Sequence, residues 1–205
     1  MEQLTSQLVD WASASCPRLG GQESGDACLV WVRPGSAQVA VVDGLGHGAE
    51  AAAAARRAIA LLGDGDWENP LDALRRCHEG LRSTRGVVMS LARFEAGPDT
   101  MTWAGVGNVE GAVLRSTKGP NSGMVALRLC NGIVGRRLTP LHAALVSVMP
   151  GDTLVFATDG IRPQYGAELA SAESLQEMAD KILAKFASGA DDALVVVVRY
   201  RGAFA

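Results

Sequence analysis

The chain has 205 residues, enough for one well-buried core but few for two. Its 19 basic and 22 acidic side chains give a formal net charge of −3, which excludes a general polyanion binder because such proteins need clustered positive charge. Hydrophobic residues make up 48% of the chain and charged residues 20%, too apolar a mixture for a disordered protein. We therefore expect residues 1–205 to form a single folded domain without a nucleic-acid partner.

The apolar runs are short, and the N-terminus carries no recognisable secretory signal. The run at 193–198 is far below the ~20 residues that a membrane-spanning helix needs. Residues 1–10 contain no basic segment followed by an apolar one, and the four cysteines lack Cys-x-x-Cys spacing. These features predict free thiols, a cytoplasmic location and no membrane partner. The absence of a heptad pattern favours a monomer and leaves the oligomeric state open.

The first half of the chain predicts a hairpin followed by two helices. Residues 27–33 and 37–43 are β-rich runs joined by the turn Pro34-Gly35-Ser36. The alanine-rich segment 49–62 has strong helix propensity. A second helix is expected over 70–81, because a proline at the first helical position loses no hydrogen-bond donor that the helix needs.

The second half predicts mostly strands. They are expected at 87–94, 100–104, 109–115, 124–129, 143–149 and 153–157, followed by a helix at 171–186 and a strand at 194–200. Strands that come in runs argue against a parallel sheet with alternating helices. The fold class is therefore α+β, with antiparallel sheets and helices outside them.

Aspartates stand where predicted strands meet tight turns, at four places in the chain. They are Ser24-Gly25-Asp26, Asp43-Gly44-Leu45-Gly46-His47-Gly48, Thr158-Asp159-Gly160 and Asp191-Asp192. Several carboxylates with backbone carbonyls form an all-oxygen donor set that suits Mg²⁺ or Mn²⁺. A single Asp-Gly pair more often marks only a turn. The segment 43–48 is more informative, since it has three glycines in six residues and matches neither an EF-hand loop nor a phosphate-binding P-loop.

These motifs resemble the metal-dependent (type 2C, PPM) Ser/Thr protein phosphatases, in particular the SpoIIE-type branch and its small RsbX-type stressosome phosphatases. Further matching segments are Thr84-Arg85-Gly86, Ala104-Gly105-Val106-Gly107-Asn108, Asn131-Gly132-Ile133-Val134-Gly135 and Pro150-Gly151-Asp152. The resemblance runs in order from about residue 24 to 200. It implies a four-layer αββα sandwich of two antiparallel sheets flanked by helices, with a metal site at one edge.

The resemblance also implies roles for individual residues. Asp43 would bridge two Mn²⁺ or Mg²⁺ ions, the carbonyl of Gly44 would bind one of them, and Asp159 and Asp191 would ligate the second. Asp192 stands where many relatives have asparagine, so it is either a ligand itself or a neighbour of the ligands. Asp26 would lie near the metals and their waters. Asp26, Asp43, Asp159 and Asp191 are thus the expected catalytic residues, and the number of ions, two or three, is left open.

Two metal ions account for phosphomonoester hydrolysis without a covalent intermediate. They lower the pKa of a water from ~15.7 toward ~7 and neutralise charge on the phosphoryl oxygens. The chain has no Cys-x5-Arg loop, which agrees with this chemistry. His47 is expected to order the loop or a water rather than to act as general acid. Larger relatives hold the phosphate with an arginine; here Arg18 is nearest in sequence but poorly aligned, and Arg85 and Arg162 are alternatives.

By the same resemblance, the expected partners are phosphorylated STAS-domain scaffold proteins of a stressosome, whose dephosphorylation resets signalling. One alternative is a catalytically silent member of the fold that serves as a binding module. Another is a GHKL-type ATP-binding protein, which needs a helix with a metal-holding asparagine upstream of its glycine-rich loop. A hairpin, not a helix, is predicted before Asp43.

Overall fold

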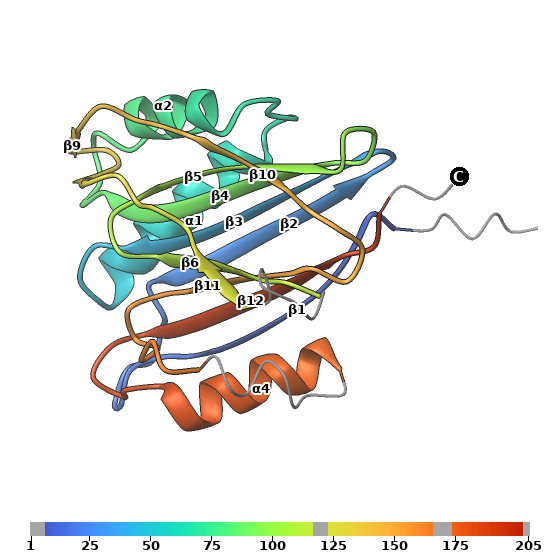
Figure 1. The fold of residues 1–205 in the computed structure, drawn as a ribbon. Coiled ribbons are helices and arrows are strands. Elements are labelled where there is room, and N and C mark those ends of the chain that lie inside the picture. Colours follow the sequence, from blue (N-terminus) through green and yellow to red (C-terminus); the bar gives the residue numbers. More distant parts are fainter. Residues whose placement is uncertain (1–6, 117–122, 166–173, 203–205) are drawn as a thin grey trace, which may run out of the picture.

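The computed structural model describes residues 7–116, 123–165 and 174–202 (Figure 1). Two five-stranded antiparallel sheets lie face to face. The first contains, in spatial order, β1 (Val9–Cys16), β12 (Ala193–Tyr200), β11 (Thr153–Ala157), β6 (Glu110–Leu114) and β7 (Met124–Ala126). The second contains β10 (Ala144–Ser147), β5 (Thr100–Val106), β4 (Val87–Glu95), β3 (Ser36–Gly44) and β2 (Asp26–Arg33). A short ribbon pairs β8 (Gly132–Ile133) with β9 (Arg137–Leu138).

Helices cover the outer face of each sheet. The helices α1 (Ala49–Gly63) and α2 (Pro70–Gly80) pack on the second sheet, and α4 (Leu175–Phe186) packs on the first, at the bottom of the view in Figure 1. The architecture is therefore the four-layer αββα sandwich that the sequence led us to expect. Within the described residues, no helix has both the length and the apolar character needed to cross a membrane.

The hydrophobic core has three layers, one between the sheets and one under each set of helices. Strand β3 shows how the sequence supplies two of them. Val39 and Val41 face the other sheet, whereas Ala40 and Val42 face the helices, because successive side chains of a strand point to opposite faces. Both faces of β3 are covered, which explains why residues 37–42 are buried without interruption.

Most predicted elements are confirmed. The hairpin is β2 and β3, and the helix over 70–81 begins at Pro70, where the side chain of Asn69 accepts a hydrogen bond of 2.9 Å from the N–H of Leu71. The prediction of a strand over 124–129 was wrong in length, since only Met124–Ala126 of this segment pairs with β6. Part of the helix expected over 171–186, at 171–173, lies outside the described residues.

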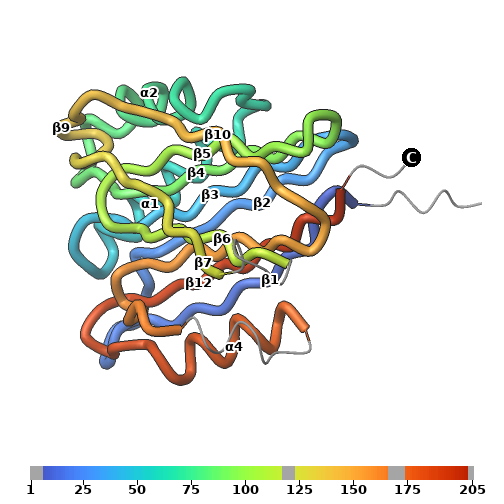
Figure 2. The backbone as a smooth tube through the Cα atoms, in the orientation of Figure 1, coloured from blue at the N-terminus to red at the C-terminus, as the bar shows by residue number. Residues whose placement is uncertain are grey.

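Strand β1 was not predicted from the sequence. Its residues alternate weakly and include small alanines and serines, which have little intrinsic preference for a strand. All eight residues nevertheless pair with β12, from Val9 opposite Tyr200 to Cys16 opposite Ala193. Figure 2 shows these two strands, from opposite ends of the chain, running side by side. The long-range partner, not local propensity, creates this strand.

Candidate active site

Two aspartates face each other at one end of the sandwich. Asp26 begins β2, Asp43 is the last residue but one of β3, and the strand register places them directly opposite each other. Each aspartate lies two residues from a side chain that packs between the sheets, Cys28 on β2 and Val41 on β3. Because alternate residues of a strand share a face, both aspartates are on the face that points to the other sheet. Like charges directly opposite each other destabilise a sheet. A proton or a bound cation that neutralises one of the two carboxylates would therefore stabilise the pair.

The pKa values of the two carboxyl groups reflect this crowding. Burial raises the pKa of Asp43 to about 8, and the negative charge of Asp26 adds to the effect. Burial also raises the pKa of Asp26 to about 7, against the opposing effect of a hydrogen bond from Thr158. Groups that hold a proton this strongly at neutral pH are typical of functional sites.

The first sheet contributes a second pair of residues to the same end. Thr158 follows β11, and its buried hydroxyl donates a hydrogen bond of 2.8 Å to Asp26. The next residue, Asp159, is exposed and accepts a hydrogen bond of 2.7 Å from the side chain of Asn108. Partial burial of its carboxyl and, next, the charge of Asp191 raise the pKa of Asp159. Thr158 and Asn108 both lie within the sequence motifs, but no role was predicted for either of them. The available signal was their position directly beside strand ends.

The adjacent acids Asp191 and Asp192 differ in what they contact. Asp192 is buried, and its two carboxylate oxygens accept hydrogen bonds from the backbone N–H groups of Arg18 (2.9 Å) and Gly25 (2.6 Å). Asp191 accepts a bond of 2.9 Å from the N–H of Asp192 and lines a pocket at the sandwich edge. Asp192 thus fastens the segment before β2, and Asp191 faces the open pocket.

The acidic pocket has a volume of about 340 Å³ and lies between the two sheets' ends. The residues that line it are Asp43, Leu45, Gly46, Val88, Gly107, Asn108, Asp159 and Asp191. Asp43, Asp159 and Asp191 are the carboxylates that line it, and among the described residues no three His, Cys, Asp or Glu side chains converge as a metal-binding group. The donor set itself, carboxylates with backbone and amide oxygens and no thiol, fits Mg²⁺ or Mn²⁺.

Gly44 sits where no side chain fits. A Cβ atom at this position would lie 2.1 Å from the carbonyl oxygen of Ala51 in α1. The backbone N–H of Gly44 donates a hydrogen bond of 3.0 Å to the carbonyl of Gly25. This close approach holds the end of β3, the first turns of α1 and the segment before β2 together beside the acidic pair.

The remaining candidates differ in their distance from the acidic pocket. His47 is exposed on the loop after β3. The guanidinium of Arg162 donates to the carbonyls of Phe186 and Lys185 at the end of α4. Arg85 lies beside the acidic pocket. Gly46 lines that pocket, and a Cβ atom on Gly46 would be 3.0 Å from the Nη1 atom of Arg85. Of the arginines considered from the sequence, the structure brings Arg85 to the glycine-rich loop.

Comparison with known proteins gives a consistent assignment. The family model described as "Stage II sporulation protein E (SpoIIE)" matches residues 33–201. A solved structure described as "The bacterial stressosome: a modular system that has been adapted to control secondary messenger signaling" is 32% identical, with a TM-score of 0.85 over 93% of this chain and 99% of that one. No curated protein sequence matches the chain.

Two further solved structures share the fold at lower identity. The structure of RsbX in complex with magnesium is 18% identical, with a TM-score of 0.84 over 97% of this chain and 98% of that one. The catalytic domain of the serine/threonine protein phosphatase PstP with two manganese ions is 15% identical, with a TM-score of 0.73 over 96% and 100%. The chain therefore belongs to the SpoIIE family and has the fold of the type 2C (PPM) phosphatases.

Proposed function

We propose that this protein is a metal-dependent phosphoserine/phosphothreonine protein phosphatase, with Asp26, Asp43, Asp159 and Asp191 as its catalytic residues. The observation that supports this most directly is the Asp26–Asp43 cross-strand pair: Asp43 lines the acidic pocket with Asp159 and Asp191, and the charges of these two residues act on both members of the pair. Such a concentration of negative charge is costly on its own. It becomes favourable when divalent cations bind there, and phosphate esters are then attracted to the same edge.

The residues present fit Mg²⁺ or Mn²⁺, and we propose two ions. Asp43, the carbonyl of Gly44, Asp159 and Asp191 would hold them, with Asp26 adjacent. We assign Asp192 to fastening the backbone of Arg18 and Gly25, since both of its oxygens already accept N–H groups. When bound, the ions supply a hydroxide nucleophile at neutral pH and neutralise charge on the phosphoryl group. The magnesium and manganese in the described RsbX and PstP complexes support this choice of metal.

The chain's own residues position the carboxylates for this chemistry. Asn108 donates to Asp159, which fixes one carboxylate oxygen of this pocket-lining residue. The hydroxyl of Thr158 holds the carboxylate of Asp26 in the same way. Leu45, whose side chain is 42% exposed, forms an apolar part of the rim where a protein substrate would make contact.

We further propose that the substrates are phosphorylated STAS-domain scaffold proteins of a stressosome, whose dephosphorylation resets signalling. The stressosome description of the 32% identical structure and the likeness to RsbX support this substrate class. Residues 1–205 are proposed to form one phosphatase domain, a view supported by the pairing of β1 with β12. The cytoplasmic location and the monomeric state stay predictions.

The activity is tested with p-nitrophenyl phosphate in chelator and after addition of manganese. We expect turnover that needs manganese and that is abolished in Asp43→Asn, with Asp72→Asn on the exposed face of α2 as the matched control. Calorimetric titration with Mn²⁺ is run on the same samples. No turnover together with little manganese binding would leave the silent binding module, whereas full turnover by Asp43→Asn would contradict the catalytic role given to Asp43.

The substrate is tested separately. Phosphorylated STAS scaffold proteins are incubated with the protein, with and without manganese, and loss of phosphate is followed by mass spectrometry. Manganese-dependent release from serine or threonine supports the proposed partner. Active enzyme that leaves these proteins phosphorylated would reject that substrate class while keeping the phosphatase assignment.

A further inference from the structure

A second pocket, of about 440 Å³, lies next to the acidic one and has the opposite charge. It is formed by α1, by the segment that follows α2, and by Arg136 near the β8–β9 ribbon. Three arginines line it, Arg57, Arg85 and Arg136, with Ser83 and with Glu50 as the acidic member. A lining with three positive charges and one negative charge stands out in a protein whose formal net charge is −3.

Two of these arginines donate hydrogen bonds to backbone carbonyls rather than to carboxylates, so no negative side chain in the described part of the chain neutralises their positive charge. The Nε atom of Arg57 donates a hydrogen bond of 2.7 Å to the carbonyl of Gly80, and Nε of Arg136 donates one of 3.2 Å to the carbonyl of Arg85. Only Arg85 forms an ion pair here, with Glu50. Within residues 7–116, 123–165 and 174–202, neither Arg57 nor Arg136 has a carboxylate partner.

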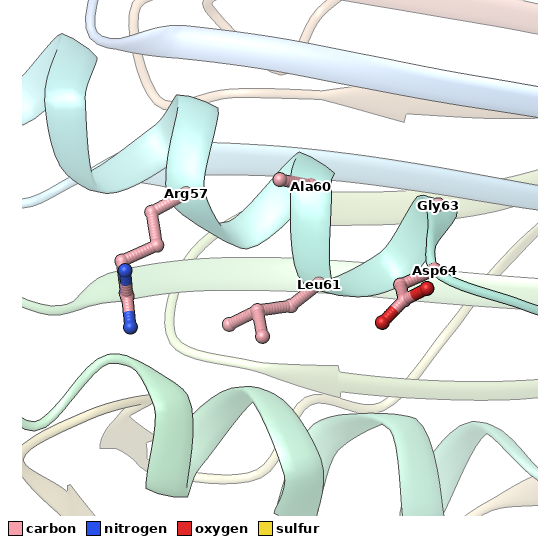
Figure 3. A pocket seen from close by; sticks show the side chains of 5 residues that line it. All are labelled: Arg57, Ala60, Leu61, Gly63 and Asp64. Atoms are coloured by element: carbon pink, nitrogen blue, oxygen red, sulfur yellow. The ribbon is translucent and has the colours of Figure 1, made fainter.

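A second hollow adjoins this pocket along α1. Figure 3 shows Arg57 and Leu61 of α1, and Asp64 directly after it, projecting toward the neighbouring helix. These residues border a further hollow of about 490 Å³, and Arg57 lines both spaces. Arg57 therefore borders open space in both hollows.

The arginine-lined pocket and the acidic pocket share one wall. Gly46 lines the acidic pocket, and the guanidinium group of Arg85 lies so close to it that a Cβ atom on Gly46 would be 3.0 Å from Nη1. The N–H of the preceding residue, Leu45, donates a hydrogen bond of 3.1 Å to the carbonyl of Gly86. A peptide whose phosphorylated residue lies in the acidic pocket would reach the arginines by crossing this single loop.

We propose that the pocket formed by Arg57, Arg85 and Arg136 binds an acidic side chain in the segment that flanks the phosphorylated residue of the substrate protein. This inference rests on the proposed phosphatase function of the neighbouring site. A guanidinium group matches a carboxylate in charge and in planar geometry. The pocket separates substrates by sequence, because an acidic flank gains these contacts while a basic flank meets like charge.

The test compares phosphopeptides that differ only in flanking charge. Each carries one phosphoserine and a glutamate, glutamine or lysine, placed in turn at successive positions on either side. We measure the ratio of kcat/KM for the glutamate peptide to that for the glutamine peptide, which cancels any effect common to both. The wild type should prefer glutamate at a defined position, and each of Arg57→Gln and Arg136→Gln should reduce that preference roughly two- to fivefold, as expected for exposed charge pairs.

Two further variants make the outcome decisive. Arg136→Glu should shift the preference toward the lysine peptide, whereas Arg75→Gln, which removes an exposed arginine paired with Asp72 on α2, should keep the wild-type ratio. Urea unfolding of each variant checks that the fold is retained. Equal kcat/KM for all three peptides at every position, or an unchanged glutamate preference in the double variant Arg57→Gln/Arg136→Gln, would overturn the proposal.

A binding measurement separates this proposal from the catalytic one. A fluorescent peptide with the glutamate flank and no phosphate is titrated with protein in the presence of chelator, and its anisotropy is recorded. Binding that weakens with added salt and is lost in the double variant supports the arginine-lined pocket even if no substrate is hydrolysed. Hydrolysis of p-nitrophenyl phosphate combined with equal anisotropy for the glutamate and glutamine peptides would reject the pocket and keep the phosphatase.

Discussion

The hydroxyl of Thr158, just after β11, donates a hydrogen bond of 2.8 Å to the carboxylate of Asp26 at the start of β2. These strands belong to different sheets, so one side chain joins the two layers at the edge of the acidic pocket. The same hydroxyl accepts a hydrogen bond of 2.9 Å from the N–H of Leu194 in β12. The position of Asp26 is therefore coupled to the packing of the opposite sheet.

Replacement of Thr158 by valine tests this coupling. Valine keeps the shape but removes the buried hydroxyl, so we expect the free energy of unfolding to fall by about 2 kcal/mol. The affinity for Mn²⁺ should fall with it, because the hydroxyl holds Asp26 in place. Thr158→Ser keeps the hydroxyl and serves as the control for the lost methyl group. Urea unfolding and calorimetry measure the two quantities. A valine variant as stable as the wild type would show that the hydroxyl contributes little.

Asp191 and Asp192 should respond differently to the same substitution. In Asp192→Asn, one of the two N–H donors, from Arg18 or Gly25, faces an amide NH₂ group instead of an oxygen. We expect a loss of about 1–3 kcal/mol in stability, because a buried donor loses its acceptor. Asp191→Asn should instead weaken Mn²⁺ binding with little change in stability. Urea midpoints and Mn²⁺ titration distinguish the two, and the reverse pattern would make Asp192 the ligand.

The raised pKa values of Asp26 and Asp43 predict how stability depends on pH when divalent ions are removed. Both carboxyl groups bind their protons more tightly in the folded than in the unfolded protein, with pKa values of about 7 and about 8. Their contribution to stability is complete below pH ~4, the unfolded pKa, and is lost as the pH rises through the folded values. In chelator, the urea midpoint should therefore decrease from pH 5 to pH 8.5.

The variant Asp43→Asn isolates this effect. Without the charge on residue 43, the pH dependence should flatten, and the variant should be more stable than the wild type at pH 8.5 in chelator, because the like-charge pair with Asp26 is gone. Manganese should reverse the order, since only the wild type has the full set of carboxylates. A wild-type midpoint that rises between pH 5 and pH 8.5 in chelator would contradict the assigned direction of the shifts.

Gly44→Ala tests the contact between β3 and α1. The new methyl group would lie 2.1 Å from the carbonyl oxygen of Ala51, so the helix must move away from the strand. We expect the free energy of unfolding to fall by about 1–3 kcal/mol, the usual effect of overpacking, and Mn²⁺ to bind more weakly. Gly97→Ala is the matched control, because no atom lies within 4 Å of its Cβ position. Equal urea midpoints for the two variants would contradict the close approach.

Much of the fold follows from local features of the sequence. Turn chemistry at Pro34-Gly35-Ser36, alanine-rich helix propensity in α1 and proline at the start of α2 act within a few residues, so the sequence alone predicts these elements. The acidic motifs were also visible, because aspartate and glycine at strand ends form a recognisable pattern. Strand β1 was not visible, since its pairing with β12 depends on residues far away in the sequence, as with Val9 and Tyr200.

The sequence by itself determined the α+β class, the SpoIIE-type motifs and the acidic residues from which a metal site can be built. Only the tertiary structure decided how those residues are used. Strand register set Asp26 opposite Asp43, and the segment before β2 gave Asp192 two N–H donors while Asp191 kept the pocket. Loop packing brought Arg85 to Gly46. The physical reason is that register, hydrogen-bond partners and loop contacts arise between distant segments, whereas propensity and motif are properties of neighbouring residues.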